Sequence, residues 1–308
     1  MLLSVIVPCF NEQEVLPFFI KEIGQTLKAL QDHDMEIIFI NDGSSDQTLQ
    51  IIKKAAQSDP RIKYISFSRN FGKEAALYAG LRKAKGDLAA VMDADLQDPP
   101  SLLLDMCRAV EKEGYDCAAA RRSSRKGEPL IRSFFARLFY KLINKMTDVE
   151  IVDGARDFRV MNRKYADAFL QMGEYNRFSK GLFSWIGFRV KWFAYENSER
   201  AAGSTKWSFW SLFKYSLEGI TAFTTMPLVA ASLVGLLVCL CALFAVIFIV
   251  VRKIAFGDPV DGWASLVCLV VFAGGLQMFF FGIMGQYMAK MYLENKKRPV
   301  YIIDEELD

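Results

Sequence analysis

Two long uncharged apolar segments constrain the fold of this chain more than any other feature. They cover residues 228–251 and 264–288, and a short segment with Pro259 and Gly262 separates them. A helix of about 20 residues crosses the roughly 30 Å hydrocarbon layer of a bilayer. We therefore predict a transmembrane hairpin over 228–288, in preference to two buried core helices of a soluble domain.

The rest of the chain has the composition of a soluble domain. Charged residues make up 24% of the sequence although 52% of it is hydrophobic. We predict one folded domain over 1–206, an aromatic-rich interfacial helix over 207–227 and a cytoplasmic tail over 289–308. The net charge of +3 gives no reason to expect a nucleic-acid partner.

Strand and helix patterns alternate through the first 111 residues. Short runs rich in valine and isoleucine alternate with segments of helical period, which favours an α/β fold with a mostly parallel sheet. The predicted strands are 3–7, 36–40, 62–67 and 88–92, and the predicted helices are 14–29, 48–57, 73–83 and 101–111. Ligands of such sheets bind at the carboxyl ends of the strands.

Polar residues cluster where three of these strands end. The clusters are Pro8-Cys9-Phe10-Asn11-Glu12, Asn41-Asp42-Gly43-Ser44-Ser45-Asp46 and Asp93-Ala94-Asp95-Leu96-Gln97-Asp98. Taken singly, Asp42-Gly43 could be a plain turn and Asp46 a helix cap. Three such clusters at one edge of a sheet instead indicate a binding site.

The third cluster indicates divalent-cation chemistry. Asp93 and Asp95 point the same way in an extended segment, and two close carboxylates repel unless a cation or proton lies between them. Hard oxygen ligands suit Mg²⁺ or Mn²⁺. His33 is the only histidine, and no Cys-x-x-Cys pair, Gly-x-Gly-x-x-Gly or P-loop sequence occurs. Serine–histidine or cysteine–histidine catalysis and dinucleotide binding are therefore not indicated.

These motifs resemble the inverting family 2 glycosyltransferases of the GT-A fold. The string from Asp93 to Pro100 resembles more narrowly the dolichyl-phosphate mannose synthases and the bactoprenol glucosyltransferases, and the resemblance extends over the two apolar segments. It implies a nucleotide-sugar site formed by Pro8, Asn11, Glu12, Asp42, Asp93, Arg200 and Lys206. It implies metal ligands at Asp93, Asp95 and Gln97, with Mg²⁺ or Mn²⁺ as the cofactor.

Two further motifs carry implied roles. Asp157-Phe158-Arg159 resembles the Gly-Asp-Phe-Arg of lipid-phosphate transferases, which makes Asp95, Asp157 and Arg159 the predicted catalytic residues. Arg156 replaces the usual glycine, and this departure leaves the sugar open between glucose and N-acetylglucosamine. The segment from Arg200 to Trp207 resembles the family's Arg-x-x-Gly-x-Ser-Lys-aromatic element, in which Arg200 and Lys206 would bind a pyrophosphate. On charge pattern alone, these two residues could be ordinary charges near anionic lipid.

A basic amphipathic helix is predicted over 130–146. Its apolar residues recur at helical spacing with arginine and lysine between them, which favours an interfacial element, with a core-packed helix as the alternative. In the resembled family this region holds the acceptor phosphate. The candidate residues are Arg122, Ser124, Arg132 and Ser133.

The predicted reaction is inverting transfer of one sugar from a UDP-sugar to undecaprenyl phosphate or another polyprenyl phosphate. The alternatives are a glycosyltransferase with another lipid or glycan acceptor, and an inactive membrane scaffold beside a flippase. The amino terminus lacks the features of a signal peptide, so we expect a multi-pass protein of the cytoplasmic membrane whose domain faces the cytoplasm. A homo-oligomer, a flippase and a downstream glycosyltransferase are open as partners.

Overall fold

The computed structural model describes residues 1–30, 33–123, 141, 143–147, 151–195, 220–256 and 262–308. The chain divides into two compact units. The first comprises Met1–Ser216 together with Arg298–Asp308, and the second comprises Leu217–Lys297. The carboxyl-terminal residues therefore belong to the same unit as the amino-terminal domain.

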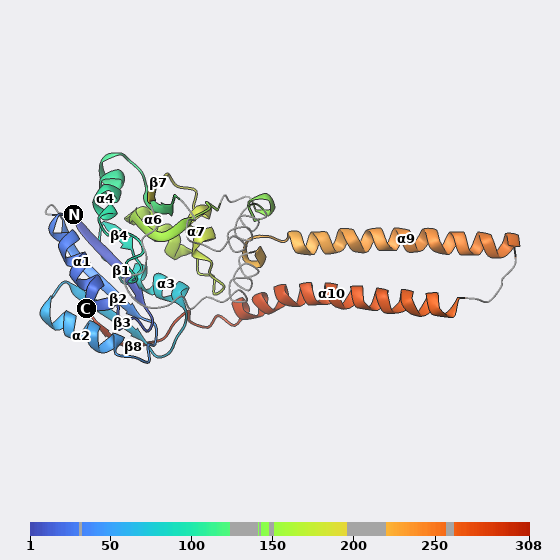
Figure 1. The fold of residues 1–308 in the computed structure, drawn as a ribbon, viewed down its shortest axis with the longest axis horizontal. Coiled ribbons are helices and arrows are strands. Elements are labelled where there is room, and N and C mark those ends of the chain that lie inside the picture. The colour runs from blue at the N-terminus through green and yellow to red at the C-terminus, as the bar shows by residue number, and fades with distance from the viewer. Residues whose placement is uncertain (31–32, 124–140, 142, 148–150, 196–219, 257–261) are drawn as a thin grey trace. The chain divides into compact units, whose positions relative to one another are not determined.

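The first unit is built on a mixed sheet (Figure 1). The described strands have the order β7-β5-β6-β4-β1-β2-β3-β8. The central four, β4, β1, β2 and β3, are parallel, while β6 runs antiparallel to β4 and β8 runs antiparallel to β3. The strands are β1 (Leu2–Cys9), β2 (Asp34–Asn41), β3 (Ile62–Phe67), β4 (Leu88–Val91), β5 (Cys117–Arg122), β6 (Ala155–Asn162), β7 (Val190–Tyr195) and β8 (Ile303–Leu307).

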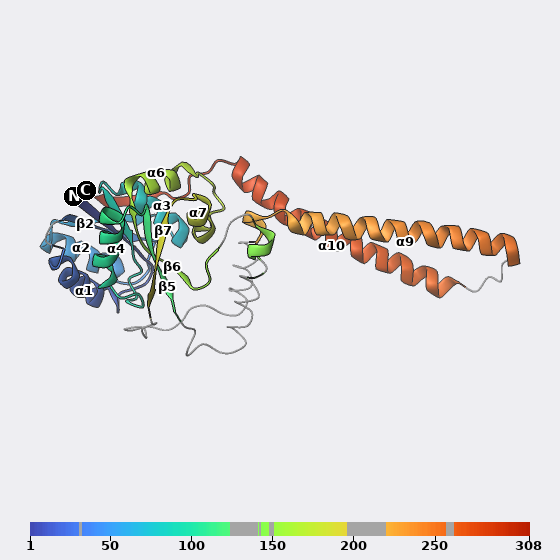
Figure 2. The same ribbon diagram turned by 90° about the horizontal axis from the view of Figure 1, so that it is seen from above.

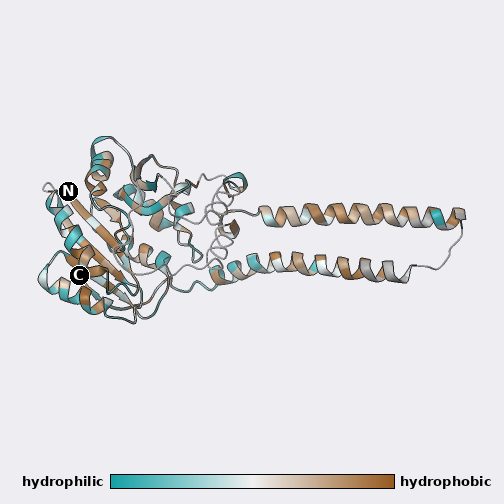
Figure 3. Ribbon diagram, viewed as in Figure 1, coloured by the Kyte–Doolittle hydropathy of each residue, from teal (hydrophilic) through white to brown (hydrophobic). Residues whose placement is uncertain are grey.

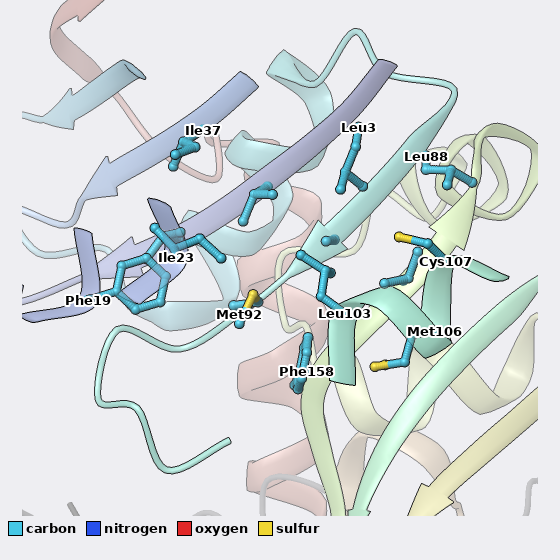
Figure 4. Close-up of a cluster of buried hydrophobic side chains, with 14 of the residues drawn as sticks. Leu3, Phe19, Ile23, Ile37, Leu88, Met92, Leu103, Met106, Cys107 and Phe158 are labelled. Atoms are coloured by element: carbon cyan, nitrogen blue, oxygen red, sulfur yellow. The ribbon is translucent and has the colours of Figure 1, made fainter. Parts of the chain in front are cut away.

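Helices cover both faces of the sheet (Figure 2). One face carries α1 (Leu16–Lys28), α2 (Thr48–Ser58) and α4 (Leu102–Lys112), and the other carries α3 (Lys73–Lys83), α6 (Arg163–Gln171) and α7 (Ser179–Trp185). Leu3, Phe19 and Met106 belong to the buried cluster between the sheet and the first set of helices (Figure 4). Burial on both faces explains why the parallel strands read as continuous apolar runs.

Side chains of β1 alternate between the two faces of the sheet. Val5 and Val7 belong to the cluster beneath α1 and α4, whereas Ile6 lies beneath α3. A Cβ atom added to Gly80 of α3 would lie 2.2 Å from a methyl carbon of Ile6. This distance is shorter than any van der Waals contact, so glycine at this position permits the close approach of α3 to the sheet.

The prediction of an α/β fold is confirmed, and the four strand–helix pairs lie where the sequence pattern expected them. The pattern did not predict β5, β6, β7 or β8. Residues 289–308, expected as a cytoplasmic tail, comprise the end of a long helix and the edge strand β8, so they are not a separate unstructured segment. The predicted interfacial helices fall mostly on residues 124–140 and 196–219, outside the described residues.

Ion pairs and aromatic stacking hold β8 against the sheet edge. Glu305 lies 2.6 Å from the Lys53 ammonium, and Glu306 lies 2.6 Å from the Lys83 ammonium. The Tyr301 ring stacks on Phe67 with 4.9 Å between the ring centroids. Strand β8 therefore covers the backbone edge of β3, which would otherwise be an unpaired sheet edge.

We expect deletion of residues 298–308 to lower the free energy of unfolding of the first unit by about 2 kcal/mol. The deletion uncovers β3 and removes the aromatic stack together with the ion pairs. Chemical unfolding of the purified protein in detergent measures the loss. Glu305→Gln is the control, and it should lose much less stability than the deletion because it removes only one largely solvent-exposed ion pair. Equal stability of the deletion and this control would contradict the assignment.

Glu36 of β2 is a buried carboxylate with a complete set of partners. Its oxygens accept hydrogen bonds from the Ser4 hydroxyl at 2.5 Å, the Lys63 ammonium at 2.6 Å and the Lys85 backbone N–H at 2.9 Å. Burial alone would raise the pKa of Glu36, but these partners outweigh burial and lower the pKa below its ordinary value of 4.5. The folded state therefore favours the ionised carboxylate.

We expect Glu36→Gln to lower the free energy of unfolding at neutral pH by about 2 kcal/mol, because charge-assisted hydrogen bonds are lost. A carboxyl with a lowered folded-state pKa stabilises the fold above its unfolded-state pKa, and this stabilisation is lost as the pH falls through the folded-state pKa. The difference between wild type and variant should therefore shrink in acid. A difference that stays constant down to acidic pH would show that the charge is not its source.

The second unit consists mainly of two long helices, α9 (Met226–Phe256) and α10 (Trp263–Asn295). Both are long and apolar enough to cross a membrane, over Met226–Ala245 and Leu269–Asn295, and none of these apolar windows is buried (Figure 3). The helices meet at Gly235, where an added Cβ would lie 3.9 Å from the Phe280 ring. Their exposed apolar surface is typical of helices that face lipid.

Candidate active site

The polar clusters of the sequence gather at the carboxyl edge of the parallel strands. Strands β1, β2 and β4 end there, and the antiparallel strand β6 begins there. Val91 of β4 pairs with Arg159 of β6, so continuing this register by two residues sets Asp93 opposite Asp157. The strand pairing thus joins two motifs that lie more than sixty residues apart in the sequence.

The first two clusters brace each other through hydrogen bonds. The Asn11 backbone N–H donates to the Ser44 hydroxyl at 3.0 Å, and the Asn11 side-chain oxygen accepts from the Ser45 N–H at 2.9 Å. The Asp46 carboxylate accepts from the N–H of Thr48, the first residue of α2, at 3.0 Å, although the N-cap position itself is occupied by Gln47. The loops after β1 and β2 therefore form one rigid surface, which includes the predicted nucleotide residues Pro8, Asn11 and Glu12.

Asp42 supports the loop that leads into α3. Its two carboxylate oxygens accept from the backbone N–H groups of Phe71 at 2.7 Å and Gly72 at 3.0 Å. Burial raises the pKa of Asp42, and the two backbone donors partly offset this effect. Each carboxylate oxygen keeps a second lone pair, so Asp42 can accept a further hydrogen bond while it supports this loop. Its contact with a nucleotide stays a prediction.

Lys73, the first residue of α3, lies between the carboxylates of Asp93 and Asp157. Its ammonium is 2.7 Å from one Asp93 oxygen and 2.9 Å from the other, and it also donates to Asp157. Burial raises the pKa of the Asp157 carboxyl, but Lys73, Lys180 and Arg159 outweigh burial and hold this pKa well below its ordinary value. Asp157 is therefore an anion at neutral pH and is not suited to act as a general acid.

A buried ion pair lies beside the predicted metal ligands. Arg156 donates to Asp98 at 2.9 Å and to the Gln97 side-chain oxygen at 3.2 Å, and the Tyr195 hydroxyl also donates to Asp98. Burial raises the pKa of Asp98, and Arg156 partly offsets this effect. Arg156, which replaces the usual glycine of the family motif, thus neutralises Asp98 and orients Gln97. The Asp95 carboxylate accepts from the Gln97 backbone N–H at 3.1 Å.

Arg159 is almost fully buried, and its contacts brace the neighbouring backbone. It donates to the carbonyl oxygens of Asp157 at 3.3 Å and Arg156 at 3.0 Å, and its guanidinium lies 3.5 Å from the centroid of the Phe183 ring. Arg159 and Lys180 also line a cavity of about 200 Å³ between β6, β7 and α7. The predicted catalytic role of Arg159 stays a prediction, whereas its bracing role follows from these contacts.

The residues of the third cluster have the donor chemistry that a divalent cation requires. Asp93, Asp95 and Gln97 offer hard oxygen atoms, and both Asp93 oxygens already contact a cation, the Lys73 ammonium. No group of three histidine, cysteine, aspartate or glutamate residues that could hold a metal ion occurs in the described part of the chain. An ion bound here would therefore need further oxygen ligands from a substrate, as Mg²⁺ commonly takes from phosphates.

Several predicted site residues lie outside the described residues. They are the acceptor-phosphate candidates Ser124, Arg132 and Ser133 and the pyrophosphate candidates Arg200 and Lys206. Arg122 is described and ends β5, where its backbone N–H donates to the Gly154 carbonyl at 3.0 Å. Its role as an acceptor contact stays a prediction.

Sequence reasoning did not predict Lys73, Asp98 or Lys180 as part of the site. Lys73 begins a predicted helix, where a lysine gives no special signal. The charge of Lys180 reaches Asp157 only because β6 and α7 pack together. Only Asp98 had a sequence signal, since it lies within the Asp93–Pro100 string that carried the family resemblance.

The fold and the clusters at the carboxyl edge define a class of protein, a glycosyltransferase with the GT-A fold. The chain belongs to the family described as glycosyl transferase family 2, whose model matches residues 4–170. The predicted family membership is thereby confirmed.

Relatives resemble the chain over nearly its whole length. CsbB of Bacillus subtilis (strain 168), whose name assigns it only to the glycosyltransferases, is 44% identical over 99% of this chain and 92% of its own length. The bactoprenol glucosyl transferase of Shigella phage SfV is 40% identical over 99% of both chains. The prophage bactoprenol glucosyl transferase homolog of Escherichia coli (strain K12) is 41% identical over 98% of both chains.

Proposed function

We propose that this chain transfers glucose from UDP-glucose to a polyprenyl phosphate in the membrane, with inversion at the anomeric carbon. The observation that carries the proposal is that the Asp93 and Asp157 carboxylates both contact the Lys73 ammonium at the carboxyl edge of the sheet. Relatives named as bactoprenol glucosyl transferases support the sugar and the lipid, since two of them are about 40% identical over nearly the whole chain. The two apolar helices support an acceptor that resides in the membrane.

The donor binds over the braced loops after β1 and β2 in this proposal. Asn11, Glu12 and Asp42 are the proposed contacts to the nucleotide of the UDP-sugar, and Arg200 and Lys206 are the proposed contacts to its diphosphate. Asp93, Asp95 and Gln97 would hold Mg²⁺ or Mn²⁺. Such an ion, when bound, neutralises charge that develops on the departing nucleoside diphosphate.

The acceptor needs no strong general base. A phosphate monoester is already ionised at neutral pH, so its oxygen can attack the anomeric carbon directly. Asp157, held as an anion beside Lys73, orients the sugar for in-line displacement. The basic residues Arg122 and Arg132, with Ser124 and Ser133, are the proposed contacts to the acceptor phosphate.

The proposed membrane arrangement follows from the path of the chain. The chain leaves the first unit near residue 216 and rejoins its sheet through β8 after residue 298. If α9 and α10 both cross the bilayer, the two connections lie on the same side of it. We propose that this side is the cytoplasm, where nucleotide sugars are made, and that the protein is multi-pass.

Transfer from radiolabelled donors to undecaprenyl phosphate tests the proposal. Purified full-length protein is incubated with UDP-glucose or UDP-N-acetylglucosamine, with and without Mn²⁺, and Asp95→Asn serves as the inactive control. We expect labelled lipid only from UDP-glucose, only with metal and only from the wild type. Labelled lipid from UDP-N-acetylglucosamine alone would overturn the sugar assignment, and its absence with every donor would overturn the acceptor.

A further inference from the structure

The side chain of Lys73 pairs with carboxylates from both halves of the active site. Its ammonium contacts both oxygens of Asp93, which follows β4, and also Asp157, which lies on β6. The Lys73 side chain is 43% exposed, whereas the side chains of Asp93 and Asp157 are 22% and 15% exposed. The lysine is thus the most exposed of these three side chains.

The backbone on both sides of Lys73 is fixed. Asp42 holds the N–H groups of Phe71 and Gly72, which immediately precede the lysine. Glu74, the next residue, accepts hydrogen bonds from the backbone N–H of Ser179 at 2.9 Å and from the Ser179 hydroxyl. The Cα atom of Lys73 therefore cannot move far, but its flexible four-carbon side chain can swing.

The position of the ammonium conflicts with a second cation on Asp93. Both Asp93 oxygens lie within 2.9 Å of the Lys73 nitrogen. A divalent ion bonded to the same carboxylate would lie within a few ångströms of the ammonium, where like charges repel strongly. Asp157 does not have this conflict, since it is not among the proposed metal ligands.

We propose that the Lys73 ammonium neutralises Asp93 in the unliganded enzyme, moves away from Asp93 when the divalent ion binds there, and stays paired with Asp157. The inference rests on the proposed function, because it takes Asp93 as a metal ligand. In the loaded enzyme, Lys73 on Asp157 places a positive charge beside the reacting phosphates. Lys73 thereby prevents tight binding of the ion without its substrate and contributes to catalysis once both are present.

Metal binding without any sugar or lipid tests the displacement. Manganese(II) is titrated into the full-length protein, and the free ion is measured by electron paramagnetic resonance. Because Lys73→Met removes the competing charge, we expect it to bind Mn²⁺ about tenfold more tightly than the wild type. Lys73→Arg keeps the charge and should bind within about threefold of the wild type.

Two further variants keep the test decisive. Lys53→Met is the matched control, since Lys53 is 41% exposed and lies 2.6 Å from Glu305 of β8, which is four places from β4 in the strand order. It should leave Mn²⁺ affinity unchanged. Lys73→Gln keeps a hydrogen-bond donor for the two carboxylates, so the fold persists if the methionine variant fails to fold, and it should show the same tightening.

The catalytic part of the proposal has its own readout. We expect Lys73→Met to lower kcat for lipid glycosylation by about 10² or more, with partial recovery in Lys73→Arg, while Mn²⁺ affinity rises. Unchanged or weaker Mn²⁺ binding in both Lys73→Met and Lys73→Gln would overturn the displacement. The Mn²⁺ titration needs no donor or acceptor, so its result is valid even if the sugar or the lipid is misassigned. The transfer assay tests the sugar and the lipid separately.

Discussion

Replacing Asp157 by asparagine is expected to lower kcat for sugar transfer by about 10²–10³. The variant keeps the size of the side chain but removes the negative charge. Lys73, Lys180 and Arg159 all favour the ionised form of Asp157 and hold its pKa well below the ordinary value. Asparagine leaves their charges partly uncompensated where the sugar is to be oriented.

Asp167→Asn is the matched control for this variant. Asp167 lies on α6 and forms an exposed 2.7 Å pair with Arg163, so the same chemical change should leave kcat near the wild-type value. Thermal unfolding of both variants establishes that they are folded. A kcat within threefold of the wild type for folded Asp157→Asn would contradict the assignment of Asp157 to the active site.

The second large effect is expected at Arg156, where alanine should lower the free energy of unfolding by about 3–5 kcal/mol. Asp98 is buried, with only 2% of its side chain exposed, and Arg156 is the cation that neutralises it. Removing the arginine leaves a buried carboxylate with the Tyr195 hydroxyl as a neutral donor. Chemical unfolding of the purified protein in detergent measures the loss.

The pH dependence of this loss identifies its source. Burial already raises the pKa of Asp98, and without Arg156 this pKa should rise further. A carboxyl with a raised folded-state pKa binds a proton more tightly in the folded protein, so stability falls as the pH rises above the unfolded-state pKa. Arg156→Ala should therefore lose more stability at mildly alkaline than at mildly acidic pH.

A double variant separates the charge from the shape of the arginine. Adding Asp98→Asn to Arg156→Ala removes the uncompensated anion, so we expect it to recover about half of the lost stability. It should also remove most of the pH dependence. No recovery in the double variant would indicate that Arg156 stabilises the fold mainly by packing.

The sequence predicted the parallel half of the sheet because each of its strands is buried on both faces. Strand β4, for example, reads as an apolar run that is buried throughout, and the helices α1, α2 and α4 have a clear helical period. Strand β8 follows a span-length apolar helix and carries acidic residues, Asp304, Glu305 and Glu306. Nothing local distinguishes it from a solvated tail, because its partner β3 lies more than two hundred residues earlier.

The active site was predictable to the extent that its residues follow one another in short motifs. Asp93 and Asp95 are two residues apart, and Asp157 belongs to a motif of its own. Their juxtaposition was not predictable, since it depends on the antiparallel register of β6 against β4. Lys73 was missed for the same reason, as its two carboxylate partners come from segments brought together only by the sheet.

Arg156 shows a different limit of sequence reasoning. The family motif marked it as a departure from glycine, and the sequence suggested a consequence for the sugar. Its structural partner is Asp98, more than fifty residues earlier, so the arginine compensates a buried charge. A departure from a motif can thus be explained by a contact that the motif does not contain.

Mass spectrometry of the lipid product is the most direct test of the central claim. Purified full-length protein is incubated with UDP-glucose, undecaprenyl phosphate and Mn²⁺, and the extracted lipid is analysed with nuclear magnetic resonance of its anomeric carbon. The account predicts undecaprenyl phosphate carrying a single β-linked glucose. Recovery of only unmodified undecaprenyl phosphate, or of an α-linked product, would contradict the account.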